Sequence, residues 1–89
     1  MKTEGWFIYI LLCNDDTLYT GITNNLAQRI EMHNSGTGAK YTRGRNPVRL
    51  IYSESLPNRS EASKRERQIK RLTRKAKLKL AGLESTEPA

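Results

Sequence analysis

Three stretches of the chain gather apolar, β-branched and aromatic residues in the short runs that are typical of β-strands. They cover residues 6–12, 17–23 and 48–53. Between the first two lies the turn-forming cluster Asn14-Asp15-Asp16. We therefore expect these two strands to form a β-hairpin.

Apolar residues spaced three and four apart predict helices in other parts of the chain. The first covers residues 26–34 and follows two candidate N-caps, Asn24 and Asn25. A second helix opens at Asn58, and a short last helix follows Thr73. The order β-β-α-β-α-α predicts an α+β fold, with an antiparallel sheet packed by helices.

A chain of 89 residues has room for one modest core. We expect a single domain over residues 6–83. A loose N-terminal segment, 1–5, precedes it, and a flexible tail, 84–89, follows it. Residues 35–47 are predicted to be a loop rich in glycine and basic residues.

The register of the hairpin decides whether Tyr9 and Tyr19 share a face of the sheet. Pairing Cys13 with Thr17 leaves a loop of three residues and places Tyr9 opposite Gly21. The tyrosines then lie on one face, and Gly21 leaves open space near Tyr9. A register shifted by one residue puts them on opposite faces. In either register the alternative is that both are ordinary half-buried strand tyrosines.

The first predicted helix has an inward stripe formed by Leu26, Ile30 and His33. Arg29 stands beside this stripe, four residues before His33. The pair can belong to a site against the sheet. Alternatively, His33 is a satisfied residue at the edge of the core and Arg29 is solvated.

The inward-facing stripe of the second predicted helix includes a carboxylate. Glu66 lies on it between Ala62 and Ile69, at spacings of four and three residues. Turning an ionised glutamate toward a core is costly unless a metal or a cation meets it. Glu66 is therefore a candidate metal ligand or an ion-pair partner of Arg65 or Lys70.

The net charge of +7 favours a polyanionic partner, above all nucleic acid. Residues 59–79 hold ten basic residues against two glutamates. On the loop, Tyr41 can stack on a base. The predicted nucleic-acid contacts are Lys40, Tyr41, Arg43, Arg45, Arg59, Arg65, Lys70, Arg71 and Arg74. A merely soluble helix surface is the alternative.

Cys13 is the only cysteine, which excludes an intramolecular disulfide and a zinc site built from cysteine pairs. The apolar run 6–13 is far shorter than the roughly 20 residues that span a bilayer. Nothing resembles a signal peptide. We expect a cytoplasmic protein with no membrane association.

Taken together, these residues resemble the GIY-YIG nuclease domain. Phe7-Ile8-Tyr9 and Tyr19-Thr20-Gly21 stand at its two signature tripeptides, and Arg29 stands at the helix arginine that follows. Further runs resemble the subgroup that includes the nuclease subunit of Slx-type endonucleases: His33-Asn34, Gly38-Ala39-Lys40-Tyr41-Thr42 and Pro57-Asn58. The likeness extends over residues 6–83 and is to the small stand-alone bacterial members.

The resemblance implies a small three-stranded antiparallel β-sheet flanked by helices. It also implies one divalent metal, Mg²⁺ or Mn²⁺, held by Glu66, and hydrolysis of a phosphodiester. Gly21 has a structural role, and either tyrosine can be the general base. The implied catalytic residues are Tyr9, Tyr19, Arg29, His33 and Glu66.

Three positions depart from the family pattern. Phe7 replaces the first glycine, Thr23 stands where excinuclease-type members carry a lysine, and no asparagine follows Glu66. The last two bear on the catalytic set and leave the fold unaffected.

The sequence therefore predicts a metal-dependent endonuclease acting on DNA, including structured or branched DNA, in repair or recombination. One alternative is a nucleic-acid-binding module, for DNA or RNA, with weak or no catalysis. Another is a nuclease that needs a partner protein to reach its substrate.

Overall fold

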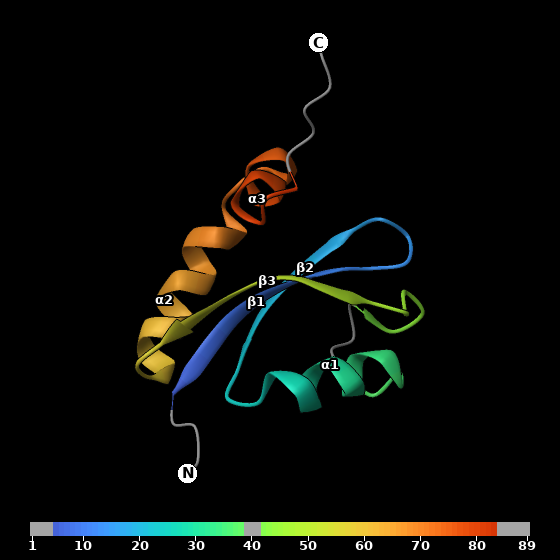
Figure 1. Cartoon of the computed structure of the whole chain (residues 1–89), viewed down its shortest axis with the longest axis horizontal. Coiled ribbons are helices and arrows are strands. Elements are labelled where there is room, and N and C mark those ends of the chain that lie inside the picture. Colours follow the sequence, from blue (N-terminus) through green and yellow to red (C-terminus); the bar gives the residue numbers. More distant parts are fainter. Residues whose placement is uncertain (1–4, 39–41, 84–89) are drawn as a thin grey trace.

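The computed structural model describes residues 5–38 and 42–83, and the fold is α+β as predicted (Figure 1). The predicted N-terminal segment 1–5, apart from Gly5, and the predicted tail 84–89 lie outside the described residues. In chain order the elements are β1 (Trp6–Leu12), β2 (Leu18–Thr23), α1 (Leu26–Asn34), β3 (Arg49–Leu56), α2 (Arg59–Lys70) and α3 (Arg74–Leu80).

The three strands form one antiparallel sheet in the order β2-β1-β3. The predicted hairpin register is correct: Tyr9 pairs with Gly21, and Leu11 pairs with Tyr19. The Cys13 amide donates to the Thr17 carbonyl at 2.8 Å, which closes a three-residue loop. Its last residue, Asp16, has a positive φ of 71°, as this loop type requires. Both tyrosines therefore point to the same face.

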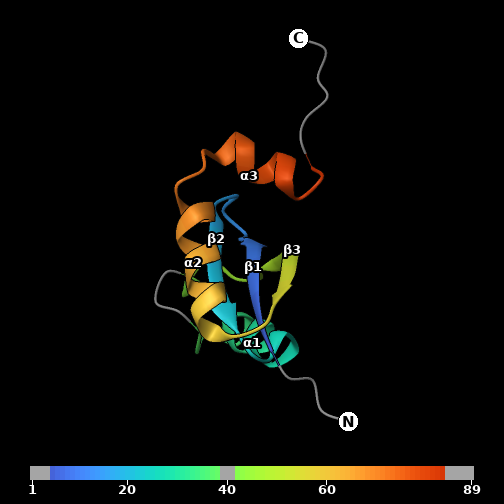
Figure 2. The ribbon, with the colours of Figure 1, turned by 90° about the vertical axis from the view of Figure 1, so that its left-hand side faces the viewer.

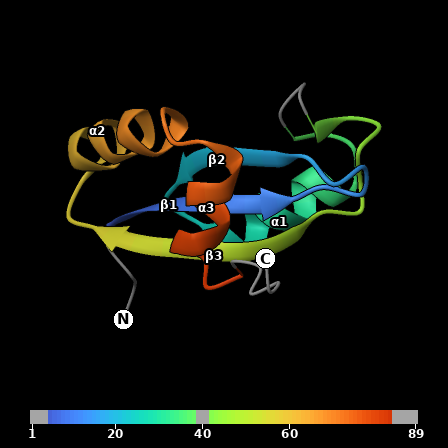
Figure 3. The ribbon, with the colours of Figure 1, turned by 90° about the horizontal axis from the view of Figure 1, so that it is seen from above.

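Helices cover both faces of the sheet, so the central strand β1 is buried on two sides (Figures 1 and 3). On one face, Tyr9 and Leu11 pack with Ile30 of α1. On the other face, Ile8 and Ile10 pack with Ile69 of α2. This two-sided burial explains why the run in β1 is almost continuously apolar.

Figure 2 shows α2 running beside β2, and Figure 3 shows α3 crossing over the strands on the same side of the sheet as α2. Each helix begins at a residue whose side chain accepts a hydrogen bond from a backbone amide of its first turn. Asn25 accepts from Gln28, Asn58 from Glu61 and Thr73 from Ala76. The predicted caps are thus confirmed, with Asn25 used in preference to Asn24.

Strand β3 is longer than its apolar pattern predicts, since it continues to Leu56 rather than ending at Ser53. Its second half is polar, so a pattern of alternating apolar residues does not reveal it. It remains a strand because β1 supplies pairing partners as far as Trp6, which lies opposite Leu56. Glu54 in this half is met by Arg65 of α2. Tertiary contacts therefore outweigh local preference here.

The segment between α1 and β3 is fastened to the end of α1 by Asn34. Its side-chain oxygen accepts from the Val48 amide at 2.6 Å, and its side-chain nitrogen donates to the Val48 carbonyl at 3.3 Å. Asn46 adds a bond from its side-chain nitrogen to the Asn34 carbonyl at 2.8 Å. These bonds fix where the loop ends relative to the helix that carries His33.

Candidate active site

Two tyrosines and a glycine form the sheet side of the site. The rings of Tyr9 and Tyr19 lie 6.3 Å apart between centroids, on the face that α1 covers. A Cβ built on Gly21 would stand 2.7 Å from the Tyr9 hydroxyl and 3.0 Å from Cε2 of Tyr19. The space that Gly21 leaves is therefore filled by the two phenol rings. Glycine at this position lets the tyrosines approach each other over the strand.

His33 enters this space from α1 and is buried, as its place on the inward stripe predicts. Its Nε2 lies 3.1 Å from the Tyr9 hydroxyl oxygen, and its Nδ1 lies 2.7 Å from the Thr42 hydroxyl oxygen. Its ring centroid is 5.3 Å from that of Tyr19. Both ring nitrogens are thus satisfied, and one of them is bonded to a tyrosine of the site.

Burial sets the protonation states of these groups. It raises the pKa of Tyr9 well above its usual value near 10, and the neighbouring Tyr19 raises that pKa further. Burial likewise raises the pKa of Tyr19 and lowers that of His33. At neutral pH the site therefore holds two phenols and a neutral imidazole.

Three charged side chains act on His33 and the two tyrosines from two helices: Arg29 of α1, and Glu66 and Lys70 of α2. Lys70 lowers the pKa of Tyr19 and is the largest of these charge effects on it. Arg29 of α1 lowers the pKa of both tyrosines and of His33, while Glu66 of α2 raises the pKa of both tyrosines. Arg29 is half-buried, and the Glu66 side chain is 23% exposed. The structure thus brings together all five predicted catalytic residues, which come from β1, β2, α1 and α2.

Glu66 pairs with Lys70 one helical turn later, with 3.1 Å between Nζ and the carboxylate oxygen. Lys70 is thus the cation that meets Glu66, one of the partners that the sequence allowed. No group of three or more His, Cys, Asp and Glu side chains lies close enough to hold a metal ion within residues 5–38 and 42–83. A single, partly exposed carboxylate suits a hard cation that keeps most of its water ligands. This one carboxylate is therefore compatible with a hydrated divalent metal ion.

The predicted nucleic-acid contacts fall into different environments. Lys40 and Tyr41 lie outside the described residues. Arg43 and Arg71 are exposed, and the guanidinium of Arg59 stacks over the Trp6 ring at 5.5 Å.

Other predicted contacts already bind acceptors within the protein. Arg65 grips both carboxylate oxygens of Glu54, at 2.8 and 3.0 Å, and so joins α2 to β3. Arg45 pairs with Asp15 at 2.7 Å. Arg74 donates to the Asp16 carbonyl at 2.6 Å. Of these three arginines, Arg65 has its charge most completely neutralised by a carboxylate of the same protein.

Sequence reasoning missed Thr42 and Glu54 as residues that organise the site. Thr42 is completely buried and bonds His33, and Glu54 holds the helix that carries Glu66. Neither shows a periodic signal, because Thr42 lies in a loop and Glu54 in a polar edge strand. For Thr42 the only signal was its place in a run that resembles the family pattern.

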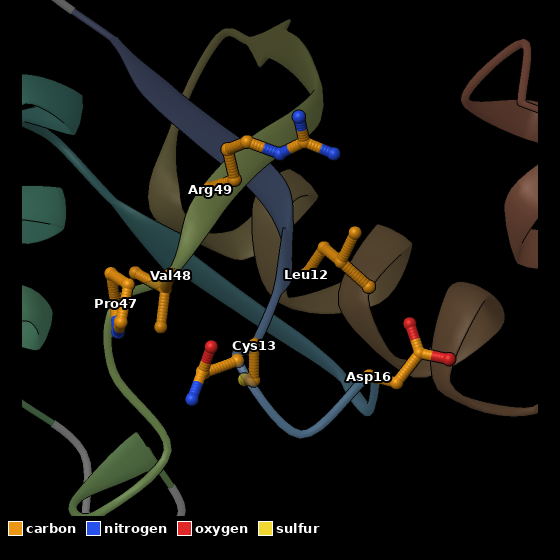
Figure 4. A pocket seen from close by; sticks show the side chains of 7 residues that line it. Leu12, Cys13, Asp16, Pro47, Val48 and Arg49 are labelled. Carbon is orange, nitrogen blue, oxygen red and sulfur yellow. The ribbon is translucent and has the colours of Figure 1, made fainter.

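A cavity of about 300 Å³ lies at the hairpin end of the sheet (Figure 4). Its lining includes Cys13, Asp16, Val48 and Arg49, and none of the five catalytic candidates. No helix among the described residues is long and apolar enough to cross a membrane.

An antiparallel sheet that presents two tyrosines to a helix arginine and histidine, with a glutamate from a later helix, defines the GIY-YIG class. Residues 5–79 match the family model of the GIY-YIG catalytic domain, so the chain belongs to this family. It is 57% identical over 79 residues to a UPF0213 protein of Clostridium perfringens, covering 89% of this chain and 85% of that protein.

Two solution NMR structures resemble this fold. The UPF0213 protein of Bacillus halodurans is 42% identical with a TM-score of 0.57, covering 93% of this chain and 88% of that one. A protein of E. faecalis is 41% identical with a TM-score of 0.60, covering 98% and 96%. Membership of the family indicates a nuclease-like function and a nucleic acid substrate.

Proposed function

We propose that this protein is an endonuclease that hydrolyses phosphodiester bonds in DNA, including branched DNA, with one divalent metal ion. The observation that carries the proposal is the convergence of Tyr9, Tyr19, Arg29, His33 and Glu66. Proton acceptors, a cation and a carboxylate are the groups that phosphodiester hydrolysis needs at one place.

Glu66 is the residue that would hold Mg²⁺ or Mn²⁺. A bound metal supplies Lewis-acid polarisation of the phosphate and stabilises negative charge on the leaving oxygen. Lys70 must release the Glu66 carboxylate for this, which is inexpensive for an ion pair with a half-exposed lysine.

Arg29 binds the phosphoryl oxygens, where its guanidinium can donate two parallel hydrogen bonds. It is half-buried beside the tyrosines, so it meets the phosphate in a partly desolvated setting. Charge that develops there in the transition state is stabilised more strongly than in water.

Tyr9 and His33 move the proton. A free phenolate is disfavoured because burial raises the pKa of Tyr9. The phenol oxygen can instead take a proton from the attacking water while its own proton passes to His33 Nε2, 3.1 Å away. Tyr19 is less buried than Tyr9 and orients the water or the phosphate. These roles select Tyr9 from the two tyrosines.

The net charge of +7 and the exposed Arg43 and Arg71 support binding to a phosphate backbone. A single domain over residues 6–83 would carry the activity, in the cytoplasm, in DNA repair. The lone Cys13 is consistent with a reducing compartment.

Purified protein should cut branched, flapped or plain duplex DNA when Mg²⁺ or Mn²⁺ is present. We expect Glu66→Ala and Arg29→Ala to abolish the cleavage. Glu61→Ala, which removes a carboxylate from the first turn of the same helix, is the matched control and should remain active. If neither metal supports cleavage that depends on Glu66 and Arg29, this proposal fails.

A second candidate is a nucleic-acid-binding module without catalysis. The ion pair between Glu66 and Lys70 favours it, because the carboxylate already has a partner. The lack of an asparagine after Glu66 favours it as well. It predicts salt-sensitive binding of DNA or RNA that neither Glu66→Gln nor a chelator changes. A nuclease that needs a protein partner would instead show cleavage only after that partner, captured in a pull-down, is added.

A further inference from the structure

The loop after α1 supplies a buried hydroxyl to the histidine of the site. Thr42 has no exposed surface, and His33 and Tyr9 are each 1% exposed. Their polar atoms form a chain: Tyr9 hydroxyl to His33 Nε2 at 3.1 Å, then His33 Nδ1 to Thr42 hydroxyl at 2.7 Å. A water molecule cannot readily replace the Thr42 hydroxyl at its end of this chain, because Thr42 is completely buried.

Backbone contacts fix Thr42 independently of its bond to His33. Its carbonyl accepts from the Arg45 amide at 3.0 Å, and the Arg45 carbonyl accepts from the Asn14 amide in the hairpin loop at 2.7 Å. On the other side of the loop, a Cβ built on Gly38 would stand 2.5 Å from His33 Nδ1 and 2.8 Å from its Cα. The loop therefore lies directly against the imidazole at two points.

The partners of a neutral imidazole decide which nitrogen carries the proton. The Tyr9 phenol is a buried donor, and His33 Nε2 lies within hydrogen-bond reach of it. If Nε2 accepts from Tyr9, the proton of the ring must be on Nδ1, which then donates to the Thr42 hydroxyl oxygen.

We propose that Thr42 is a positioning residue that holds His33 in the tautomer with its proton on Nδ1. The lone pair of Nε2 is thereby directed at the Tyr9 hydroxyl. The proposal deepens the proposed function, since this lone pair is the one that receives the Tyr9 proton. The O–H bond of water breaks as a new O–H bond forms on Tyr9. The original Tyr9 O–H bond breaks as N–H forms on Nε2, which leaves His33 as an imidazolium.

The surroundings of His33 favour a neutral ring before reaction. Arg29 faces it from α1, Tyr9 from β1 and Tyr19 from β2, and Thr42 on the loop is uncharged. Burial, followed by Arg29, lowers the pKa of the imidazole. The imidazole is therefore neutral throughout the neutral pH range, and one of its two tautomers can be favoured there.

His33 is the only histidine of the chain, so the ¹⁵N NMR signals of its ring are unambiguous. In the wild-type protein without DNA or metal, we expect Nδ1 to be protonated and Nε2 to be unprotonated. Thr42→Val keeps the shape of the side chain and removes the hydroxyl. It should change the tautomer ratio by roughly tenfold toward Nε2–H, about the worth of one hydrogen bond. Thr42→Ser should restore the wild-type ratio.

A wild-type protein with its proton on Nε2 would overturn the proposal, as would a Thr42→Val protein that keeps both the fold and the wild-type ratio. If Thr42→Val does not fold, Thr42→Ala removes the hydroxyl with a smaller side chain and gives the same test. In the cleavage assay Thr42→Val should lower kcat about tenfold with little change in KM, and Thr42→Ser should not. The NMR result does not depend on cleavage, so failure of the nuclease proposal is distinguishable from failure of this one.

Discussion

Gly21 lies opposite Tyr9 in the β1–β2 ladder, and a Cβ on Gly21 would stand 2.7 Å from the Tyr9 hydroxyl oxygen. The glycine of the Tyr19-Thr20-Gly21 tripeptide is therefore required for the packing of Tyr9 in the first tripeptide. The phenol reaches His33 only because the facing strand has no side chain at that point.

Gly21→Ala tests this relationship. Its new methyl group must displace the Tyr9 ring, which breaks the bond to His33. We expect a loss of about 1–3 kcal/mol in the free energy of unfolding, as for overpacked sites, and loss of cleavage. Denaturant titration and the DNA cleavage assay measure the two effects.

Gly44→Ala is the matched control. Gly44 has a φ of +78°, and no atom of residues 5–38 or 42–83 outside its immediate neighbours lies within 4 Å of a built Cβ. Its substitution costs about 1 kcal/mol through backbone strain alone and should leave cleavage intact. Equal activity in both alanine variants would contradict the packing argument.

The free energy of unfolding should fall as the pH falls from 7 to 5. His33 has a lowered pKa in the folded protein, while the unfolded chain titrates near about 6.5. In this window the unfolded state binds more protons than the native state, so acid favours unfolding. The lowered carboxyl pKa values of Asp15 and Glu54 add their own losses only in more acidic solution.

Urea titrations at several pH values measure this slope. His33→Gln removes the titrating ring, so its slope between pH 7 and 5 should be flatter, whatever its absolute stability. An unchanged slope would show that His33 is not the group that titrates.

Lys70→Ala should strengthen the binding of Mn²⁺ to the protein. Lys70 competes for the Glu66 carboxylate at 3.1 Å, and its side chain is 54% exposed. Exposed pairs are worth up to about 1 kcal/mol, so we expect at most a fivefold decrease in Kd. Isothermal titration calorimetry measures it. Lys64→Ala, which removes a lysine paired with Glu61 on the same helix, should have little effect. Weaker Mn²⁺ binding in Lys70→Ala would argue against Glu66 as the ligand.

Arg65 and Arg71 should behave differently toward DNA, although they lie six positions apart in sequence. Arg65 holds Glu54, and burial of this pair is partial, with side chains 32% and 26% exposed. Arg65→Ala should lower the free energy of unfolding by about 2 kcal/mol, as for bonds between charged groups. The salt dependence of DNA affinity should then stay unchanged.

Arg71 is exposed after the last turn of α2. Arg71→Ala should leave stability unchanged and reduce the slope of log K against log[salt] by about 0.9, the loss of one phosphate contact. Fluorescence anisotropy at several salt concentrations gives both slopes. A reduced slope in Arg65→Ala would restore Arg65 as a DNA contact.

Local patterns were sufficient to predict most of the architecture. The bounds of β1 and α1, the three helix caps and the hairpin register all follow from short-range features of the chain. The turn cluster favours a three-residue loop, and the bond from the Cys13 amide to the Thr17 carbonyl confirms this register over the shifted one that the sequence also allowed.

Long-range pairing was harder to predict. The polar end of β3 and the bond of Glu54 to Arg65 join residues that no periodicity relates. Alternation of apolar and polar residues along a strand indicates that one face of the strand is buried. An edge strand whose side chains are largely exposed does not show this alternation.

The amino-acid sequence by itself determined the set of elements and the inward direction of His33, and it offered a hairpin register that places Tyr9 and Tyr19 on one face. These depend on the periods of strands and helices and on a local turn. Only the tertiary structure decided that His33 bonds Tyr9 on one side and Thr42 on the other, and that Arg65 of α2 binds Glu54 of β3. Such hydrogen bonds form only when atoms from distant segments are placed to within a few tenths of an ångström, and the packing of both faces of the sheet sets that placement.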